Sequence, residues 1–248
     1  MIIEENSIQL PQHPAYHTIG LSYLMKEVGT ADGRQDDVSR VSIDRIRRQY
    51  LAIRAEGCLR PTLEKEESSM CFEDRIAGDD SYVFLSVREK DWTSLPGQAC
   101  FGFIFDAYSL IDKGAILRTS DLVGKYTDIL KELVAEQIGW DSVSTSSAEE
   151  VAKFKDEYLR LLDAVRATNE TVQGVHEILH LFGQKVREIQ QHEQLTGDAA
   201  KAYIGTYRPF EFAELLVYEQ LPLAWAAAAF EHGIVIPMVG NDEFVQKL

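Results

Sequence analysis

A pair of histidines with a glutamate between them is the first pattern in this chain that could do chemistry. The stretch GVHEILHLFGQKV contains His176, Glu177 and His180 in the order His-Glu-x-x-His. On a helix, residues four apart share one face, so both imidazoles could bind one zinc ion while the glutamate acts as a base. The pattern therefore predicts a zinc metallopeptidase as one candidate function.

A catalytic zinc site needs a third protein ligand. One class of zinc peptidases would have a third histidine at the position of Val186. Glu211 or Glu214 could serve instead if the segment around them were helical, but residues 215–218 and Pro222 favour a strand. If this segment is a strand, the zinc metallopeptidase hypothesis largely fails.

The helix that carries the histidines should bury a different face. Its apolar residues recur at helical spacing and form one stripe: Val172, Val175, Leu179, Phe182, Val186 and Ile189. His176 and His180 lie to one side of this stripe, at the boundary or in solvent. A solvated helix flank is therefore the alternative to a zinc site.

Composition limits the remaining function classes. The chain has 248 residues, 45% of them hydrophobic, and a net charge of −15, which repels nucleic acid and anionic membranes at long range. The longest apolar run, LPLAWAAAAF, is about half the length that spans a bilayer. No signal peptide is visible and the three cysteines follow no paired pattern, so we expect reduced thiols, a cytoplasmic location and no membrane partner.

Arginines gather in one stretch with few acidic residues. They are Arg40, Arg45, Arg47, Arg48, Arg54 and Arg60. The cluster is either a solvated helix face or an anion site for the phosphates of a nucleotide or a nucleic acid.

The elements that must position these residues change in character along the chain. A helix is predicted over residues 39–55, stopped by Gly57, and buried strands over 81–87 and 99–108. A shorter strand follows Gly114, and a helix begins after Ser120 or Asp121.

A helical block is expected next. It contains a helix that opens with the capping-box pattern Ser147-x-x-Glu150 and a second helix over residues 171–194. Residues 210–223 read as a strand, 224–233 as a short helix, and 234–239 as a last strand. The pattern predicts one α+β domain over residues 1–248 with a helical insertion at about 122–200.

Five pieces in the strand-containing parts have a familiar order. They are Tyr16-His17-Thr18; Ile53, Gly57, Leu59 and Pro61; Val83, Leu85 and Ser86; Phe105-Asp106; and Glu214, Leu221 and Pro222. In this order the chain resembles the ADP-ribosyltransferase superfamily, in the branch of RNA 2′-phosphotransferases and DarT-type DNA-modifying toxins. The likeness covers roughly residues 16–121 and 210–239, and it implies a split β-sheet core.

The resemblance also implies a chemistry. Members of this superfamily are glycosyltransferases that use NAD as a substrate and break the bond between nicotinamide and ribose. The likeness puts Glu214 in the role of the catalytic carboxylate, with Glu211 as the alternate. Such a carboxylate orients the ribose hydroxyls, stabilises the developing positive charge and acts as a base toward the acceptor.

Further residues would bind NAD if the resemblance holds. His17, with Thr18 beside it, would hydrogen-bond the adenosine-side ribose, and Ser86 would lie near the cofactor or cap the next turn. The candidates to stack on nicotinamide are Tyr82, Phe84 and Tyr108, and those to meet the pyrophosphate are Arg54 and Arg60.

Partners follow from the same likeness. The acceptor would be a macromolecule: the acidic charge favours a protein, and the DarT-type likeness favours nucleic acid and suggests a neutralising or regulatory protein partner. Zinc belongs only to the metallopeptidase alternative. A non-enzymatic interaction protein, with the helical block as a binding arm, is the third hypothesis.

Overall fold

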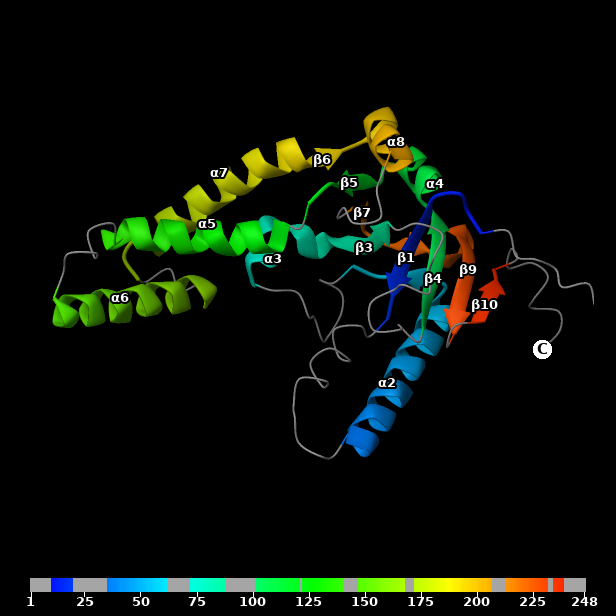
Figure 1. Cartoon of the computed structure of the whole chain (residues 1–248), viewed down its shortest axis with the longest axis horizontal. Helices are drawn as coiled ribbons and strands as arrows, with labels where there is room; N and C mark the ends of the chain where they lie inside the picture. Colours follow the sequence, from blue (N-terminus) through cyan, green and yellow to red (C-terminus); the bar gives the residue numbers. More distant parts are fainter. Residues whose placement is uncertain are drawn as a thin grey trace, which may run out of the picture. The chain divides into compact units, whose positions relative to one another are not determined.

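The structure is a computed structural model that describes residues 10–19, 35–61, 72–87, 101–120, 122–140, 147–167, 172–206, 213–231 and 234–238. The chain is α+β, and it divides into two compact units (Figure 1). The sheet unit comprises Met1–Ser69, Ser81–Ser120 and Leu195–Leu248, and the helical unit comprises Met70–Asp80 and Asp121–Gln194.

The sheet unit is built on an eight-stranded sheet with the order β10-β9-β4-β1-β3-β7-β5-β6. The strands are β1 (Pro14–Thr18), β3 (Tyr82–Val87), β4 (Phe101–Asp106), β5 (Ile116–Arg118), β6 (Gln194–Leu195), β7 (Glu214–Tyr218), β9 (Ala226–Glu231) and β10 (Ile234–Pro237). The pairings from β10 through to β5 are antiparallel. The order interleaves early and late strands, so the sheet forms only when distant parts of the chain meet.

A second, two-stranded sheet joins β2 (Cys58–Leu59) to β8 (Leu221–Pro222). A 3-10 turn follows β8 at Leu223–Trp225, and another precedes β3 at Asp79–Ser81.

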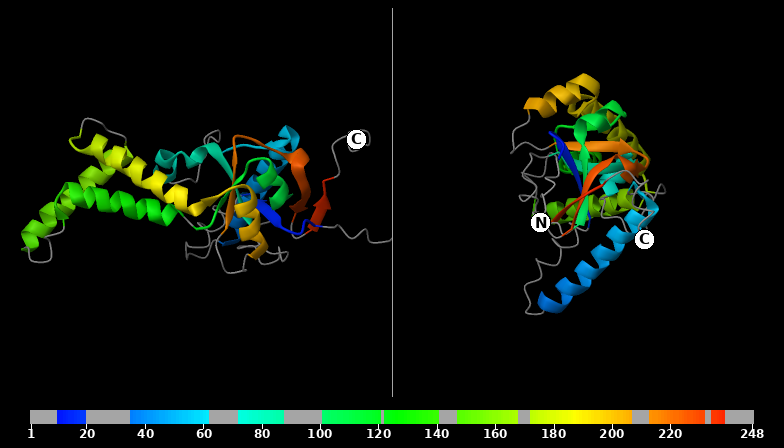
Figure 2. Two further views of the ribbon diagram at one scale, coloured as in Figure 1. Left: turned by 90° about the horizontal axis from the view of Figure 1, so that it is seen from above. Right: turned by 90° about the vertical axis from the view of Figure 1, so that its right-hand side faces the viewer.

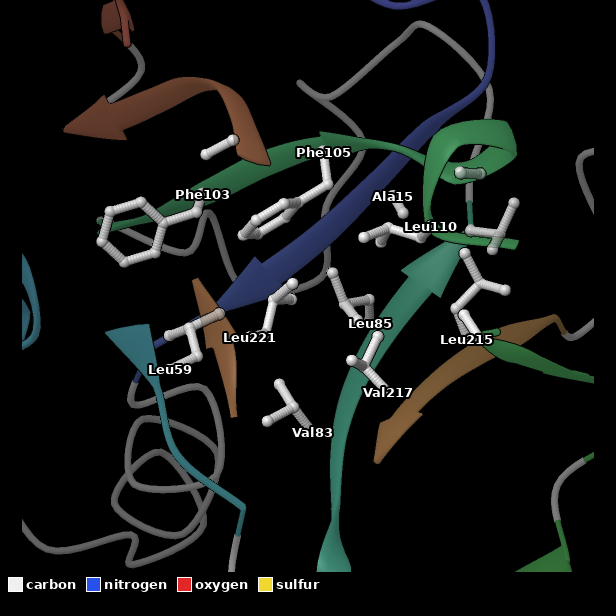
Figure 3. Close-up of a cluster of buried hydrophobic side chains, with 14 of the residues drawn as sticks. Ala15, Leu59, Val83, Leu85, Phe103, Phe105, Leu110, Leu215, Val217 and Leu221 are labelled. Carbon is white, nitrogen blue, oxygen red and sulfur yellow. The ribbon is translucent and has the colours of Figure 1, made fainter. Parts of the chain in front are cut away.

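Among the described residues, the helices of the sheet unit are α2 (Gln35–Glu56), α4 (Ala107–Asp112) and α8 (Gly197–Thr206). Their apolar residues join those of the strands in the main core, as Tyr50 of α2, Leu110 of α4 and Ile204 of α8 show. Figure 3 shows part of this core, with Phe103 and Leu215 among the strand residues that point into it. One face of the sheet is therefore covered by helices.

The opposite face carries a smaller cluster of Tyr16, Ile104, Ala228 and Phe230. Strand alternation explains the division, since successive side chains of a strand point to opposite faces.

The helical unit contains α3 (Phe72–Ala77), α5 (Leu122–Gln137), α6 (Ala148–Arg166) and α7 (Val175–Glu193). Figures 1 and 2 show the three long helices packed side by side. They enclose a core of their own, which includes Tyr126 and Leu130 of α5, Leu161 of α6, and Phe182 and Val186 of α7. Within the described part of the chain, none of the helices is long and apolar enough to cross a membrane.

The capping box predicted at Ser147 is confirmed. The Ser147 side chain accepts a hydrogen bond from the Glu150 backbone N–H, and the Glu150 carboxylate accepts one from the Ser147 backbone N–H at 2.9 Å. Both residues are exposed at the start of α6.

The short helix predicted over residues 224–233 is wrong. Residues Ala226–Glu231 form β9, which pairs with β4 on one side and β10 on the other. Alanine is the best helix former, but here small side chains let β9 fit between its neighbours, and Ala228 and Ala229 are fully buried. Tertiary pairing overrides the local propensity.

Two other boundaries differ from expectation. The strand predicted over 99–108 ends at Asp106, whose carboxylate caps α4 by accepting a hydrogen bond from the Ser109 backbone N–H, so Tyr108 lies on that helix. The helical unit ends at Gln194, and α8 belongs to the sheet unit because Ala200 and Ile204 join the main core.

Candidate functional site

Glu214, the predicted catalytic carboxylate, is the first residue of β7, a strand inside the sheet. It is paired in register with Ser86 of β3 on one side and with Arg118 of β5 on the other. Directly opposed residues of neighbouring strands project to the same face, with their Cβ atoms about 5 Å apart. The strand register therefore places a hydroxyl and a guanidinium group on either side of the carboxylate.

The same line continues across the sheet. Ser86 is in register with Tyr16 of β1, so four adjacent strands present Tyr16, Ser86, Glu214 and Arg118 on one face. We call these four residues the carboxylate row. Tyr16 and Arg118 are buried, whereas Ser86 and Glu214 are partly exposed. The centre of the row is the part that a ligand could reach.

The residues beside the row on this face are mostly apolar or aromatic. Phe84 is paired with Leu216, and Leu216 with Ile116, one row further along the strands. Beyond them Tyr82 is opposite Tyr218, and the two rings meet edge to face with centroids 5.5 Å apart. Tyr82 thus lies on the same face as Glu214, at the far end of the aromatic and aliphatic side chains that follow the carboxylate row.

His17 lies on the other face. It is paired with Phe103, whose ring belongs to the main core, and strand alternation separates it from Tyr16. Its Nδ1 atom is 2.9 Å from the carbonyl oxygen of Phe84. The structure therefore brings Ser86, but not His17, beside Glu214.

Thr18, the last residue of β1, is paired with Gly102. Alternation returns it to the face of Tyr16 and Glu214, where it is partly exposed.

Arg54, predicted to meet a pyrophosphate, binds a carboxylate of the protein. Its Nη1 atom is 3.3 Å from Oε1 of Glu231 at the end of β9, and its guanidinium lies 5.7 Å from the centre of the Tyr50 ring. Tyr50 belongs to the main core, so Arg54 lies on the face opposite Glu214. These contacts attach α2 to the sheet.

The other arginines of the cluster are mainly on the exposed surface of α2. Arg45, Arg47 and Arg48 are exposed, and Arg60 forms an ion pair with Glu56 at 3.0 Å. The side chain of Arg40 lies outside the described residues. This arrangement matches the solvated helix face that was one of the two expectations.

Tyr108, a predicted nicotinamide platform, has partners within the sheet unit. Its ring stacks on His13 with centroids 4.3 Å apart, and its hydroxyl donates a hydrogen bond to the carbonyl oxygen of Lys201 at 3.0 Å. The ammonium group of Lys201 lies 5.7 Å from the ring centre. These contacts join the start of the sheet to α4 and α8.

The histidine pair lies on α7, and His176, Glu177 and His180 are all exposed, as the apolar stripe predicts. The side-chain nitrogen of Gln184 is 3.0 Å from Nε2 of His180. Among the described residues, no group of three or more histidine, cysteine, aspartate or glutamate side chains could hold a metal ion. Glu214 is on a strand of the sheet unit, and Glu211 lies outside the described residues.

Sequence reasoning missed Tyr16 and Arg118 as members of the site. Arg118 carried a signal, because a charged residue directly after the apolar pair Ile116-Leu117 in a short strand points to a buried polar role. Its alignment with Glu214 required the register of two strands that lie far apart in the sequence.

Comparisons of the chain with protein-family models, curated proteins and solved structures find no match. The ADP-ribosyltransferase resemblance therefore stays a prediction, which the arrangement of the site must support.

Proposed function

We propose that this chain is an NAD-dependent ADP-ribosyltransferase with Glu214 as its catalytic carboxylate. The observation that carries the proposal is the register of Glu214 with Ser86, which makes neighbours of the carboxylate that the resemblance implies is catalytic and of one residue that it implies binds NAD. Both side chains are partly exposed. A carboxylate beside a hydroxyl offers acceptors and a donor to the adjacent hydroxyl groups of a ribose.

The pairing of the remaining motif pieces supports the same proposal. β1 with His17 and Thr18 pairs with β3 and β4, and β3 pairs with β7. β2 and β8, which contain Leu59 and the Leu221-Pro222 pair, form the second sheet together. All five pieces of the resemblance are therefore direct neighbours of another piece.

The reaction would proceed at the ribose carbon that bears nicotinamide. The bond between that carbon and the nicotinamide nitrogen breaks, nicotinamide leaves with the bonding electrons, and positive charge develops on the ribose. The ionised Glu214 would stabilise this charge and hold a ribose hydroxyl. It would then take the proton of the acceptor group as that group bonds to the ribose carbon.

The proposal is tested by measuring nicotinamide release from NAD with the wild-type protein and Glu214→Gln. We expect the substitution to lower kcat by at least about 100-fold, because it removes the charge and the base but keeps the shape. Glu219→Gln, at an exposed position just after β7, should leave the rate unchanged. Full activity in Glu214→Gln would exclude Glu214 as the catalytic residue.

The acceptor, the partners and the location belong to the proposal as well. We propose a macromolecular acceptor, and the net charge of −15 favours a protein over nucleic acid. A neutralising or regulatory protein partner would fit the toxin branch of the resemblance. A cytoplasmic location fits three cysteines without a paired pattern, of which Cys58 is a free thiol.

The metallopeptidase hypothesis is not part of this proposal. One of its two candidate third ligands, Glu214, lies on a strand rather than a helix. Zinc binding by His176 and His180 stays a prediction, which stoichiometric zinc in the purified protein, lost in His176→Ala, would support.

A further inference from the structure

Arg118 is a buried charged residue that takes no part in the proposed reaction. It is 2% exposed, and the other charged residues described as buried are Glu73 and Asp79. Those two lie in the helical unit, where Glu73 is 3.7 Å from Arg166 and Asp79 is 3.4 Å from Gln190. Arg118 instead lies directly across from the partly exposed Glu214.

The Arg118 side chain extends across the strand that carries Glu214. Its guanidinium carbon lies 5.8 Å from the centre of the Phe84 ring, and Phe84 is on β3. β7 lies between β5 and β3 in the sheet. The side chain therefore passes over β7 on the face where Glu214 projects, with the Phe84 ring beneath its charged end.

Burial decides between two roles for this guanidinium. A residue that binds the phosphates of a substrate must be open to solvent before the substrate arrives, and Arg118 is closed off. Arginine keeps its charge at all ordinary pH values, and a buried charge is costly unless an opposite charge or hydrogen bonds offset it. A role that acts through a neighbouring carboxylate of the protein fits this burial.

We propose that Arg118 is a positioning residue that keeps the carboxylate of Glu214 ionised and aimed toward the partly exposed centre of the carboxylate row. This inference rests on the proposed function for its catalytic consequence. It does not rest on it for the coupling of the two side chains. An opposite charge within a few ångströms favours the ionised form of a carboxyl group, and a base must be ionised to accept a proton.

Few other ionisable side chains lie near Glu214 on this face of the described strands, and none of them is a lysine, arginine or histidine. They are the phenols of Tyr16 on β1, Tyr82 on β3 and Tyr218 on β7, which share its face by the strand register. Asp106 of β4 is on the same side by alternation, but its carboxylate caps α4. Arg118 is therefore the positive group to test.

The first experiment measures the coupling without using NAD. Denaturant unfolding is compared for the wild-type protein, Arg118→Gln, Glu214→Gln and the double variant. If the two side chains interact, the fall in the unfolding midpoint of the double variant is smaller than the sum of the two single falls. Additive falls would overturn the inference. Arg118→Met, which keeps an unbranched apolar stem and adds no buried polar group, replaces Arg118→Gln if that variant fails to fold.

The second experiment separates positioning from a purely structural role. In Arg118→Gln we expect kcat for nicotinamide release to fall about 100-fold with little change in KM for NAD, because a misplaced group costs rate rather than binding. The acidic limb of the pH–rate profile should move to higher pH. Arg118→Lys should restore part of the rate, and Lys131→Gln, exposed on α5, should not change it.

The two experiments fail in distinguishable ways. Coupling without nicotinamide release by the wild-type protein would reject the proposed function and leave the Arg118–Glu214 interaction standing. Nicotinamide release that persists at the wild-type rate and pH dependence in Arg118→Gln would reject the positioning role and leave the proposed function standing.

Discussion

At the scale of single residues, the sheet has little room on the face that carries Glu214. Gly102 of β4 lies opposite Thr18 of β1 and Phe230 of β9. A Cβ atom added at Gly102 would lie 2.3 Å from Cζ of Phe230 and 2.4 Å from the carbonyl oxygen of His17. Real atoms do not approach this closely, so the glycine is required by packing rather than by its backbone angles.

We therefore expect Gly102→Ala to lower the free energy of unfolding by about 1–3 kcal/mol, because the backbone of β1 cannot move aside cheaply. Gly124→Ala is the matched control, since nothing lies within 4 Å of its added Cβ atom and it is exposed on α5. That substitution should raise stability by up to about 1 kcal/mol. Chemical denaturation of both variants tests this, and equal stabilities would contradict it.

At the scale of elements, α2 is attached to the sheet through Tyr50. The ring is fully buried and packs near Phe101 and Phe103, with centroids 5.2 and 5.3 Å away. Burial, and then a hydrogen bond with Glu231, raise the pKa of Tyr50 to about 12. The neutral phenol is therefore the form that the folded protein holds.

This shift predicts how stability depends on alkaline pH. The folded protein resists ionisation of Tyr50, whereas the unfolded chain ionises near pH 10. The contribution of Tyr50 is thus complete below pH 10 and is lost as pH rises toward about 12. As the pH rises through this range, the unfolding midpoint should fall less steeply for Tyr50→Phe than for the wild-type protein.

Tyr218→Phe serves as the control for this measurement, because Tyr218 is 61% exposed. It should follow the wild-type curve. A Tyr50→Phe protein with the wild-type alkaline profile would show that the Tyr50 hydroxyl is not held in the neutral form by the fold.

At the scale of the whole molecule, the described residues form two main cores that share no residue. The core of the sheet unit contains Phe103, and that of the helical unit contains Phe182, both fully buried. Each core is filled by residues from one unit only. Removing a core side chain should therefore lower local stability mainly within the unit that contains that side chain.

Phe182→Ala should cost about 3–5 kcal/mol and lower hydrogen-exchange protection mainly in α5, α6 and α7. Phe103→Ala is the matched variant and should lower protection mainly in β1, β3 and β4. Hydrogen exchange followed by mass spectrometry tests both. An equal loss of protection throughout the chain in either variant would show that the two units unfold as one.

Several elements could be predicted from the sequence because local signals agreed with the final packing. The helix predicted over 39–55 is confirmed by α2, which ends at Glu56. The next residue, Gly57, has a φ of 76°, a backbone conformation that glycine adopts without strain. The capping box at Ser147 follows from the local pattern Ser147-x-x-Glu150, and the exposed positions of His176 and His180 follow from helical periodicity. The strand at Glu214–Tyr218 followed from its β-branched and aromatic residues.

The candidate site itself depended on the tertiary structure. The sequence by itself determined the α+β class, the helical block and the strand on which Glu214 lies. Only the sheet register decided that Ser86 and Arg118 flank Glu214, that His17 lies on the opposite face, and that the alanine run of β9 forms a strand. Helix periodicity is set by neighbours a few residues apart, whereas strand register is set by contacts between segments that meet only in the folded chain.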